Sequence, residues 1–248
     1  MSARSRSSRP AHQRRSLTIL PQPDATTCGP TCLHAVYRYY GDDIELAQVI
    51  AEVSRLESGG TLAVMLANHA LRRGYAARIY TYNLQAFDPT WFNGDVDLRD
   101  RLQRQAEVKA SRRLHTSTAA YLRFLERGGE VRFEDLTTRL LARLLQRGTP
   151  ILTGLSATYL YRSMREFGPK DEDDDLRGTP VGHFVVLSGY EGSSGRVRIA
   201  DPWVPNPVAS AHYYRAGAER VIGAILLGVL TYDANLLIVT PREDGPPS

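Results

Sequence analysis

Two cysteines lie four residues apart near the start of the chain, at positions 28 and 32. Cys28 stands where a helix is expected to begin, because Pro30 suits a first helical turn and an apolar stripe follows it. The unpaired N–H groups and the positive dipole end of a helix start stabilise a thiolate and can donate to an oxyanion. Cys28 is therefore the candidate nucleophile, the alternative being an unreactive buried thiol. Cys32 falls one turn deeper on the apolar stripe, and Gly29 is expected to let a substrate carbonyl approach the backbone.

A reactive thiolate needs a base, and one of the six histidines is placed to act as one. His183 opens a predicted strand directly after Gly182, at a sheet edge from which an imidazole can project. The others fall in a polar tail (His12), on solvated helix faces (His34, His115), near an apolar stripe as a core residue (His69) or in an aromatic patch (His212). His183 is therefore the candidate base.

Asp201 can be placed beside His183 by counting along a predicted hairpin. Residues 183–190 and 196–200 have the pattern of two strands, joined by the turn residues 191–195. With residues 192–194 at the centre of the turn, the numbers of paired residues sum to about 384–386, which places residues 201–203 opposite His183. Since cross-strand Cβ atoms lie roughly 4.5–5.5 Å apart, the Asp201 carboxylate should reach the imidazole. A carboxylate that orients the ring is what a cysteine–histidine pair requires.

Gln22 is a fourth candidate. It lies six residues before Cys28, on an extended segment flanked by Pro21 and Pro23. A side-chain amide in this position can donate to the oxygen that becomes negative when a carbonyl is attacked. We therefore predict an oxyanion donor at Gln22, which by itself would be interpreted as a solvated loop residue.

Helices are expected to carry the thiol. Apolar spacing predicts one helix over residues 27–40, a second after the adjacent Asp42 and Asp43, and a third from residue 59 to Gly74. A strand is expected over residues 76–82. Charged amphipathic helices are expected over residues 91–146, with an interruption at residues 128–129.

Strands are expected to carry the histidine. A β-like run covers residues 150–155, and a polar loop with five acidic residues at 171–175 covers residues 162–180, before the predicted hairpin. The apolar block over residues 221–239 should be a helix followed by a strand. Helices first and antiparallel strands later is the order of an α+β fold rather than of wound βαβ units.

These motifs together resemble a known family. Gln22, the run Cys28-Gly29-Pro30-Thr31-Cys32-Leu33, then Gly182-His183-Phe184-Val185-Val186-Leu187 and Ala200-Asp201-Pro202 resemble the bacteriocin-processing (double-glycine leader) cysteine peptidases, within the papain-like superfamily. The resemblance covers residues 1–75 and 150–205. It implies a papain-like cysteine peptidase fold, a helical lobe packed on an antiparallel sheet lobe. It also implies the roles of nucleophile, base, orienting acid and oxyanion donor for Cys28, His183, Asp201 and Gln22.

The sequence also departs from that family. Members of the processing type are commonly fused to a membrane transporter, whereas neither a transmembrane segment nor a phosphate-binding loop is predicted here. Residues 83–148 look like an additional helical insertion. Specificity for a Gly-Gly leader is therefore not carried over to this chain.

Composition limits the partners that we expect. Of the net charge of +4, five positive charges lie in an acid-free N-terminal stretch, so the remainder sums to 4 − 5 = −1. These charges belong to Arg4, Arg6, Arg9, Arg14 and Arg15. A nearly neutral body is not a general phosphate-binding surface, so nucleic acid is not an expected partner. No apolar run reaches the ~20 residues that span a bilayer.

Two cysteines are too few for a disulfide framework or a cysteine zinc site, and the 171–175 run lacks calcium-loop spacing. We therefore expect a cytoplasmic protein without metal or cofactor, and its oligomeric state stays open. The expected organisation is a disordered basic tail (1–16), a single peptidase domain (17–240) with a helical insertion at about 83–148, and a flexible C-terminus (241–248).

The predicted reaction is hydrolysis of a peptide or amide bond in a peptide or protein substrate, through a thioester intermediate. One alternative is an amide-forming acyl transfer that uses the same residues. The other is a non-catalytic peptide-binding module that kept the fold. The presence of all four catalytic residue types favours an enzyme over a binding module.

Overall fold

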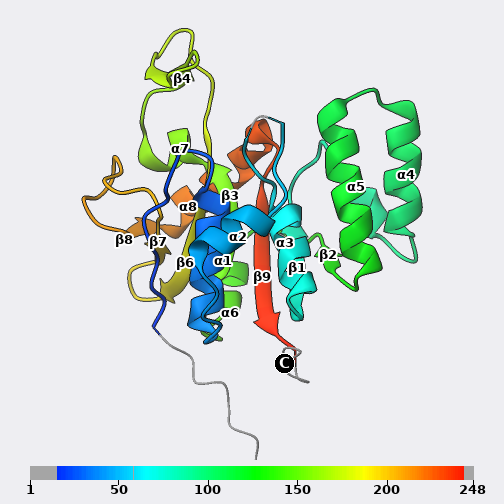
Figure 1. The fold of residues 1–248 in the computed structure, drawn as a ribbon, viewed down its shortest axis with the longest axis horizontal. Coiled ribbons are helices and arrows are strands. Elements are labelled where there is room, and N and C mark those ends of the chain that lie inside the picture. The colour runs from blue at the N-terminus through cyan, green and yellow to red at the C-terminus, as the bar shows by residue number, and fades with distance from the viewer. Residues whose placement is uncertain (1–15, 58, 243–248) are drawn as a thin grey trace, which may run out of the picture.

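The computed structural model, which describes residues 16–57 and 59–242, is built around a sheet whose seven described strands lie in the order β2-β1-β9-β3-β6-β7-β8 (Figure 1). β1 and β2 are parallel, and the other neighbouring pairs are antiparallel. The strands are β1 (Tyr75–Thr81), β2 (Glu130–Arg132), β3 (Ile151–Ser156), β6 (Gly182–Glu191), β7 (Arg196–Ala200), β8 (Tyr213–Gly217) and β9 (Asn235–Pro241).

Helices cover both faces of this sheet. On one face lie α1 (Cys28–Tyr39), α2 (Leu46–Glu52) and α3 (Ala63–Arg72); on the other lie α6 (Thr138–Leu145) and α8 (Ala218–Leu227). The helices α4 (Leu98–Val108) and α5 (Arg112–Glu126) stand together beside the sheet, next to α3 (Figure 1). Short turns of helix are η1 (Pro89–Phe92), α7 (Ala157–Tyr161) and η2 (Gly228–Thr231).

The alternation of side chains along β6 joins the two halves of the core. Phe184 and Val186 are buried with residues of α1 and α3, whereas Val185 and Leu187 are buried with residues of α6 and α8. Successive side chains of a strand point to opposite faces, so a strand that is apolar at every position must be covered on both sides. β6 is therefore fixed in position by both helical layers, and with it His183, the second residue of the strand.

The predicted α+β class is confirmed, with a sheet that is antiparallel apart from one strand pair. The predicted helices and strands of the first 82 residues correspond to α1, α2, α3 and β1. The expected interruption at residues 128–129 separates α5 from β2. The strand β8 was not predicted, and the helical layer on the second face of the sheet was not foreseen.

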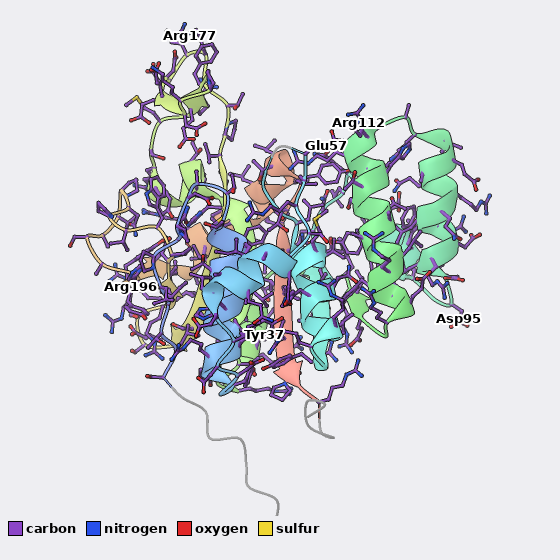
Figure 2. The ribbon with its side chains drawn as sticks, in the orientation of Figure 1. Tyr37, Glu57, Asp95, Arg112, Arg177 and Arg196 are labelled. Atoms are coloured by element: carbon purple, nitrogen blue, oxygen red, sulfur yellow. The ribbon has the colours of Figure 1, made fainter. Side chains whose placement is uncertain are left out.

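Residues 162–180 form a projecting hairpin rather than the expected plain loop (Figure 1). Two short strands, β4 (Glu166–Phe167) and β5 (Glu172–Asp173), pair antiparallel. Arg177 lies at the outer end of this projecting hairpin (Figure 2). Its guanidinium carbon lies 4.3 Å from the centroid of the Phe167 ring, and its side chain forms an ion pair with Asp174. These strands could not be predicted from the sequence, because each has only two residues and lies in a polar segment without an alternating pattern.

The expected positions of three histidines can be compared with the structure. His69 is a hydrogen-bonded core residue, as predicted: its ring lies 2.7 Å from the Tyr37 hydroxyl and 3.0 Å from Glu52. His115 is exposed, as predicted. The interpretation of His34 as a solvated residue is wrong, because α1 is enclosed by the sheet and its neighbouring helices over residues 28–37.

Two predictions concern the ends of the chain, and both lie largely outside the described residues. The predicted basic tail covers residues 1–16 and the predicted flexible C-terminus residues 241–248; of these only Ser16, Pro241 and Arg242 are described, and Pro241 is the last residue of β9. None of the helices in the described part of the chain is long and apolar enough to cross a membrane.

Candidate active site

The loop before α1 sets the position of Cys28. Its tight turn is closed at the Asp24 carbonyl, which accepts hydrogen bonds from the Thr27 backbone N–H (3.3 Å), the Thr27 hydroxyl (3.0 Å) and the Gln22 side chain (2.9 Å). The Asp24 carboxylate accepts from the backbone and the hydroxyl of Thr26, both at 2.8 Å. This local network fixes the chain direction into α1, whose first residue is Cys28.

Cys28 lies at the helix start that the sequence predicted. Thr27, the residue before this helix, makes no side-chain capping hydrogen bond, so the backbone N–H groups of the first turn lack that partner. Glycine is required at position 29 for packing, because a Cβ there would lie 2.7 Å from Thr61 Cγ2. The space in the direction of that Cβ is filled by Thr61, Leu66 and Phe184.

His183 joins Cys28 to Asp201. Its Nε2 lies 2.9 Å from Asp201 Oδ1, and the ring also makes a hydrogen bond with the Cys28 side chain. Because Nε2 faces Asp201, the bond to Cys28 falls to Nδ1. Burial by itself lowers the pKa of His183, but the hydrogen bonds and negative charges of Asp201 and Cys28 outweigh it and raise this pKa from 6.5 to about 10. The protonated imidazolium is thus strongly favoured in this site.

The hairpin between β6 and β7 has nearly the register expected from the sequence. Val186 pairs with Ala200 and Leu187 with Ile199, and a bulge between Leu187 and Gly189 shifts the register by one residue near the turn. The outer pairs sum to 386, within the predicted interval. Continued past Ala200, this register puts Trp203 opposite His183 and Asp201 on the diagonal, a spacing that long side chains still span.

Asp201 is fully buried and accepts four hydrogen bonds. Oδ1 accepts from His183 Nε2 (2.9 Å) and from the Trp203 backbone N–H (3.0 Å), while Oδ2 accepts from the hydroxyls of Tyr161 (2.7 Å) and Tyr214 (2.8 Å). Burial raises the pKa of Asp201, but His183 and these donors outweigh it and leave the pKa below its ordinary value. The carboxylate is therefore held ionised.

The sequence did not indicate the residues around Asp201. Neither Tyr161 nor Tyr214 was among the site residues predicted from the sequence. The Trp203 ring also packs edge-on against His183, with centroids 6.1 Å apart. The sequence carried no usable signal for Tyr214, because its position depends on the pairing of β8 with β7, in which it lies opposite Ile199.

Gln22 is brought to the same end of the sheet. Its backbone N–H donates to the Pro202 carbonyl (2.9 Å), next to Asp201. Its side-chain Nε2 donates to the Asp24 carbonyl, and its Oε1 is buried without a hydrogen-bond partner among the described residues. A primary amide has two N–H donors, so one remains for a ligand.

Cys32 is placed differently from Cys28. It is completely buried, its thiol donates to the Phe184 carbonyl at 3.3 Å, and burial raises its pKa well above the ordinary thiol value. A neutral, enclosed thiol is a poor nucleophile. The hydrogen bond instead ties α1 to β6, the two elements that carry Cys28 and His183.

We expect iodoacetamide to alkylate Cys28 much faster than Cys32, because only Cys28 combines a helix start with a histidine. Mass mapping after brief labelling checks this order, and earlier modification of Cys32 would contradict it.

Cys32→Ala should lower the free energy of unfolding by about 1–3 kcal/mol, since it removes a buried thiol and leaves a carbonyl without its donor. Urea unfolding measures this loss, with Cys28→Ala as the matched variant expected to change stability less.

Metal-ligating side chains do not gather anywhere in the described part of the chain: residues 16–57 and 59–242 hold no group of three or more His, Cys, Asp or Glu placed to bind an ion. The side chains of the site supply a chemistry of their own. A thiol, an imidazole with a second hydrogen bond to a carboxylate, and N–H donors at a helix start can together perform nucleophilic attack on a carbonyl.

A model of the Peptidase_C39 like family matches residues 14–220 of the sequence. This match includes all four predicted site residues. No curated protein matches the chain.

Three solved structures are similar to it over most of its length. One is the peptidase domain of Streptococcus ComA, a bi-functional ABC transporter (16% identity, 91% of this chain and 99% of that chain, TM-score 0.41). Another is a double glycine motif protease from an AMS/PCAT transporter in complex with the leader peptide (15%, 92% and 94%, 0.44). The third is Xylellain, a cysteine protease from Xylella fastidiosa (14%, 92% and 84%, 0.47).

Proposed function

This chain belongs to the Peptidase_C39 like family, and we propose from that premise that it is a cysteine peptidase that cleaves a peptide bond through a thioester on Cys28. Membership confirms the resemblance recognised in the sequence. The observation that carries the proposal is the linked arrangement of Cys28, His183 and Asp201, with His183 hydrogen bonded to both other residues.

In the proposed acylation step, the His183 ring takes the thiol proton at Nδ1 and the Cys28 thiolate attacks the substrate carbonyl carbon. A C–S bond forms and the carbonyl oxygen becomes negative. When the C–N bond breaks, the imidazolium returns its proton to the leaving amine, and a thioester remains on Cys28. Water, deprotonated by the now neutral His183, then attacks the thioester and releases the carboxylic acid and the thiol.

Two donors are proposed for the developing oxyanion. The backbone N–H of Cys28 lies at the start of α1, where the helix dipole favours negative charge. The second donor is the remaining side-chain N–H of Gln22, because its backbone is tied to Pro202 beside the catalytic carboxylate. Gln22→Ala should therefore lower kcat with little change in KM.

The test of this function works without a defined substrate. The purified chain is incubated with a proteome-derived peptide library, and new termini are identified by mass spectrometry, with Cys28→Ser as the control. Cleavage that requires Cys28 supports the peptidase. A parallel incubation contains an added amine, and its attachment to a new C-terminus would indicate acyl transfer. Binding of peptides without any new termini would indicate a binding module.

The positions of α4 and α5 indicate that the helical insertion is shorter than the predicted range of residues 83–148. Within that range α6 packs against the sheet with β6, whereas α4 and α5 stand beside it (Figure 1). Arg112, at the start of α5, forms an ion pair with Glu57 in the loop between α2 and α3 (Figure 2). We propose that the insertion runs from η1 to β2. The rest of residues 17–240 is proposed to form one peptidase domain. The cytoplasm remains the predicted location of the protein.

The projecting hairpin is proposed to favour basic substrates. Its two ends attach to Tyr161 and Gly182, next to the site, and its acidic side chains Asp171, Asp173 and Asp175 are exposed. Asp174 is different, because its carboxylate accepts hydrogen bonds from the Leu176 and Arg177 backbone.

Replacing Asp171 and Asp173 by Asn should raise KM for a lysine- or arginine-rich peptide by roughly two- to tenfold, since an exposed ion pair contributes about 0.2–1 kcal/mol. We expect kcat to change less and added salt to reduce the difference. The control removes two exposed acids outside the hairpin, Asp95→Asn at the far side of the molecule (Figure 2) with Glu107→Gln on α4. Equal KM values in both double variants would assign the hairpin no part in substrate choice.

A further inference from the structure

Two tyrosine hydroxyls converge on one oxygen of the buried Asp201. Tyr161 Oη and Tyr214 Oη lie 2.7 and 2.8 Å from Oδ2, the oxygen that His183 does not use. Burial, followed by the charge of Asp201, raises the pKa of both phenols far above the ordinary value. Both hydroxyls therefore keep their protons and act as donors throughout the usable pH range.

The two tyrosines come from separate parts of the chain. Tyr161 is the last residue of α7, which is tied to the start of β6 by Ala157 N–H to Val181 O (2.8 Å) and Val181 N–H to the Thr158 hydroxyl (3.0 Å). Tyr214 lies in β8, and Asp201 N–H donates to the His212 carbonyl of the same segment (2.8 Å). The two hydroxyls that donate to the Asp201 carboxylate therefore come from two segments, α7 and β8, whose backbones are each fixed by hydrogen bonds.

We propose that Tyr161 and Tyr214 are positioning residues of the proposed peptidase site. Their donors hold Oδ2, so that Oδ1 is aimed at His183 Nε2 and, among the residues that the structure describes, shared only with the Trp203 N–H. This proposal rests on the proposed function, and it assigns to the two phenols a task that the cysteine–histidine–aspartate set does not perform.

That task arises from the change of charge at His183 during the reaction. While the ring is protonated, its positive charge keeps the buried carboxylate ionised. Once the ring has given its proton to the leaving amine, Asp201 is a buried carboxylate without a cationic partner, and burial favours its protonation. Two O–H donors stabilise the charged form in that interval, so Oδ1 keeps accepting from Nε2–H and Nδ1 stays free to take a proton from water.

The test compares Tyr161→Phe, Tyr214→Phe and the double variant with matched controls on the same two elements. Tyr159→Phe on α7 removes a hydroxyl from a residue that is 46% exposed. Tyr213→Phe on β8 removes one from a residue that is 50% exposed, whose hydroxyl accepts from the Ile19 backbone N–H at 3.0 Å and makes no hydrogen bond with Asp201. The first readout is the rate of Cys28 alkylation by iodoacetamide as a function of pH. The second is the downfield proton NMR signal of the His183 Nε2–H in protein with labelled histidine. Neither readout requires a peptide substrate.

Each single variant should lower the alkylation rate at neutral pH roughly three- to tenfold, the effect of weakening one hydrogen bond to a charged group. The double variant should lower it further and move the acid limb to higher pH, because an Asp201 that is easier to protonate loses its hold on the imidazolium sooner. The His183 N–H signal should broaden or shift. Both controls should follow the unchanged protein.

A double variant whose pH profile and N–H signal match those of the unchanged protein would overturn the proposal. A lower melting temperature with no change in either readout would do the same, since it would reduce the phenols to packing residues. Absence of peptide cleavage by the unchanged protein is a different outcome. It would contradict the proposed peptidase activity, while the labelling and NMR results would still decide the role of the two tyrosines.

Discussion

Replacing Cys28 by alanine should abolish peptide hydrolysis and leave the protein folded. Removal of the nucleophile from a catalytic set of this kind lowers kcat by about 10⁴-fold or more, because no other group can form the covalent intermediate. The cost in stability should be small, since the thiol lies at a helix start and its loss leaves no buried charge without a partner. Turnover of a cleaved library peptide, measured beside circular dichroism and urea unfolding, checks both statements.

Cys32→Ala is the control for Cys28→Ala, because it removes the other thiol from the same helix. It should keep most of its turnover despite its lower stability. Residual hydrolysis by Cys28→Ala at more than about one hundredth of the original rate would exclude a thioester on Cys28. His183→Ala should be nearly as inactive, but it also leaves the buried Asp201 without its cationic partner and should therefore be less stable.

The core of the site could be predicted because its signals are local. A thiol at a helix start depends only on residues near Cys28, and the contact between His183 and Asp201 depends only on one hairpin. The bulge between Leu187 and Gly189 was not foreseen. It did not spoil the prediction, because the pairs beyond the bulge sum to 386, which places Trp203 opposite His183 and Asp201 on the diagonal.

The rest of the site could not be read from the sequence, because it depends on distant pairing. Tyr214 reaches Asp201 only through the alignment of β8 with β7, and the segment before β8 carries no clear strand pattern. Tyr161 depends on the docking of α7 against the start of β6. Likewise β9 was predicted as a strand, but its place between β1 and β3 follows from contacts with residues more than 80 positions away.

The second large effect is expected for Asp201→Asn. The Trp203 backbone N–H can only donate, so it should hold the amide oxygen in the place of Oδ1, facing His183. The amide nitrogen then faces the two phenols, whose oxygens can accept. The hydrogen bond to Nε2 and the ring tautomer should thus survive, and the principal loss is the negative charge.

Loss of that charge should lower the pKa of His183 from about 10 toward its ordinary value of 6.5, because the Asp201 charge and hydrogen bond counteract the effect of burial. The imidazolium should then persist over a narrower pH range, so the alkaline limb of the kcat profile moves to lower pH. We expect kcat at neutral pH to fall by about 10- to 10³-fold, less than the ~10⁴-fold loss known for a serine protease, because a preformed thiolate needs less help in the attack.

Alkylation of Cys28 separates this explanation from a general loss of structure. In Asp201→Asn the labelling rate should fall at acidic and neutral pH, where the thiolate depends on the imidazolium, and should recover at alkaline pH, where the thiol ionises without it. Asp233→Asn is the control for the loss of a buried acidic side chain: Asp233 accepts from the Ala63 backbone N–H instead of from His183, and burial raises its pKa to about 7. Unchanged turnover and unchanged labelling in Asp201→Asn would remove Asp201 from the mechanism. A loss of labelling that is equal at every pH would instead indicate that Cys28 has become inaccessible or the fold is disrupted, because at alkaline pH the thiolate forms without the imidazolium.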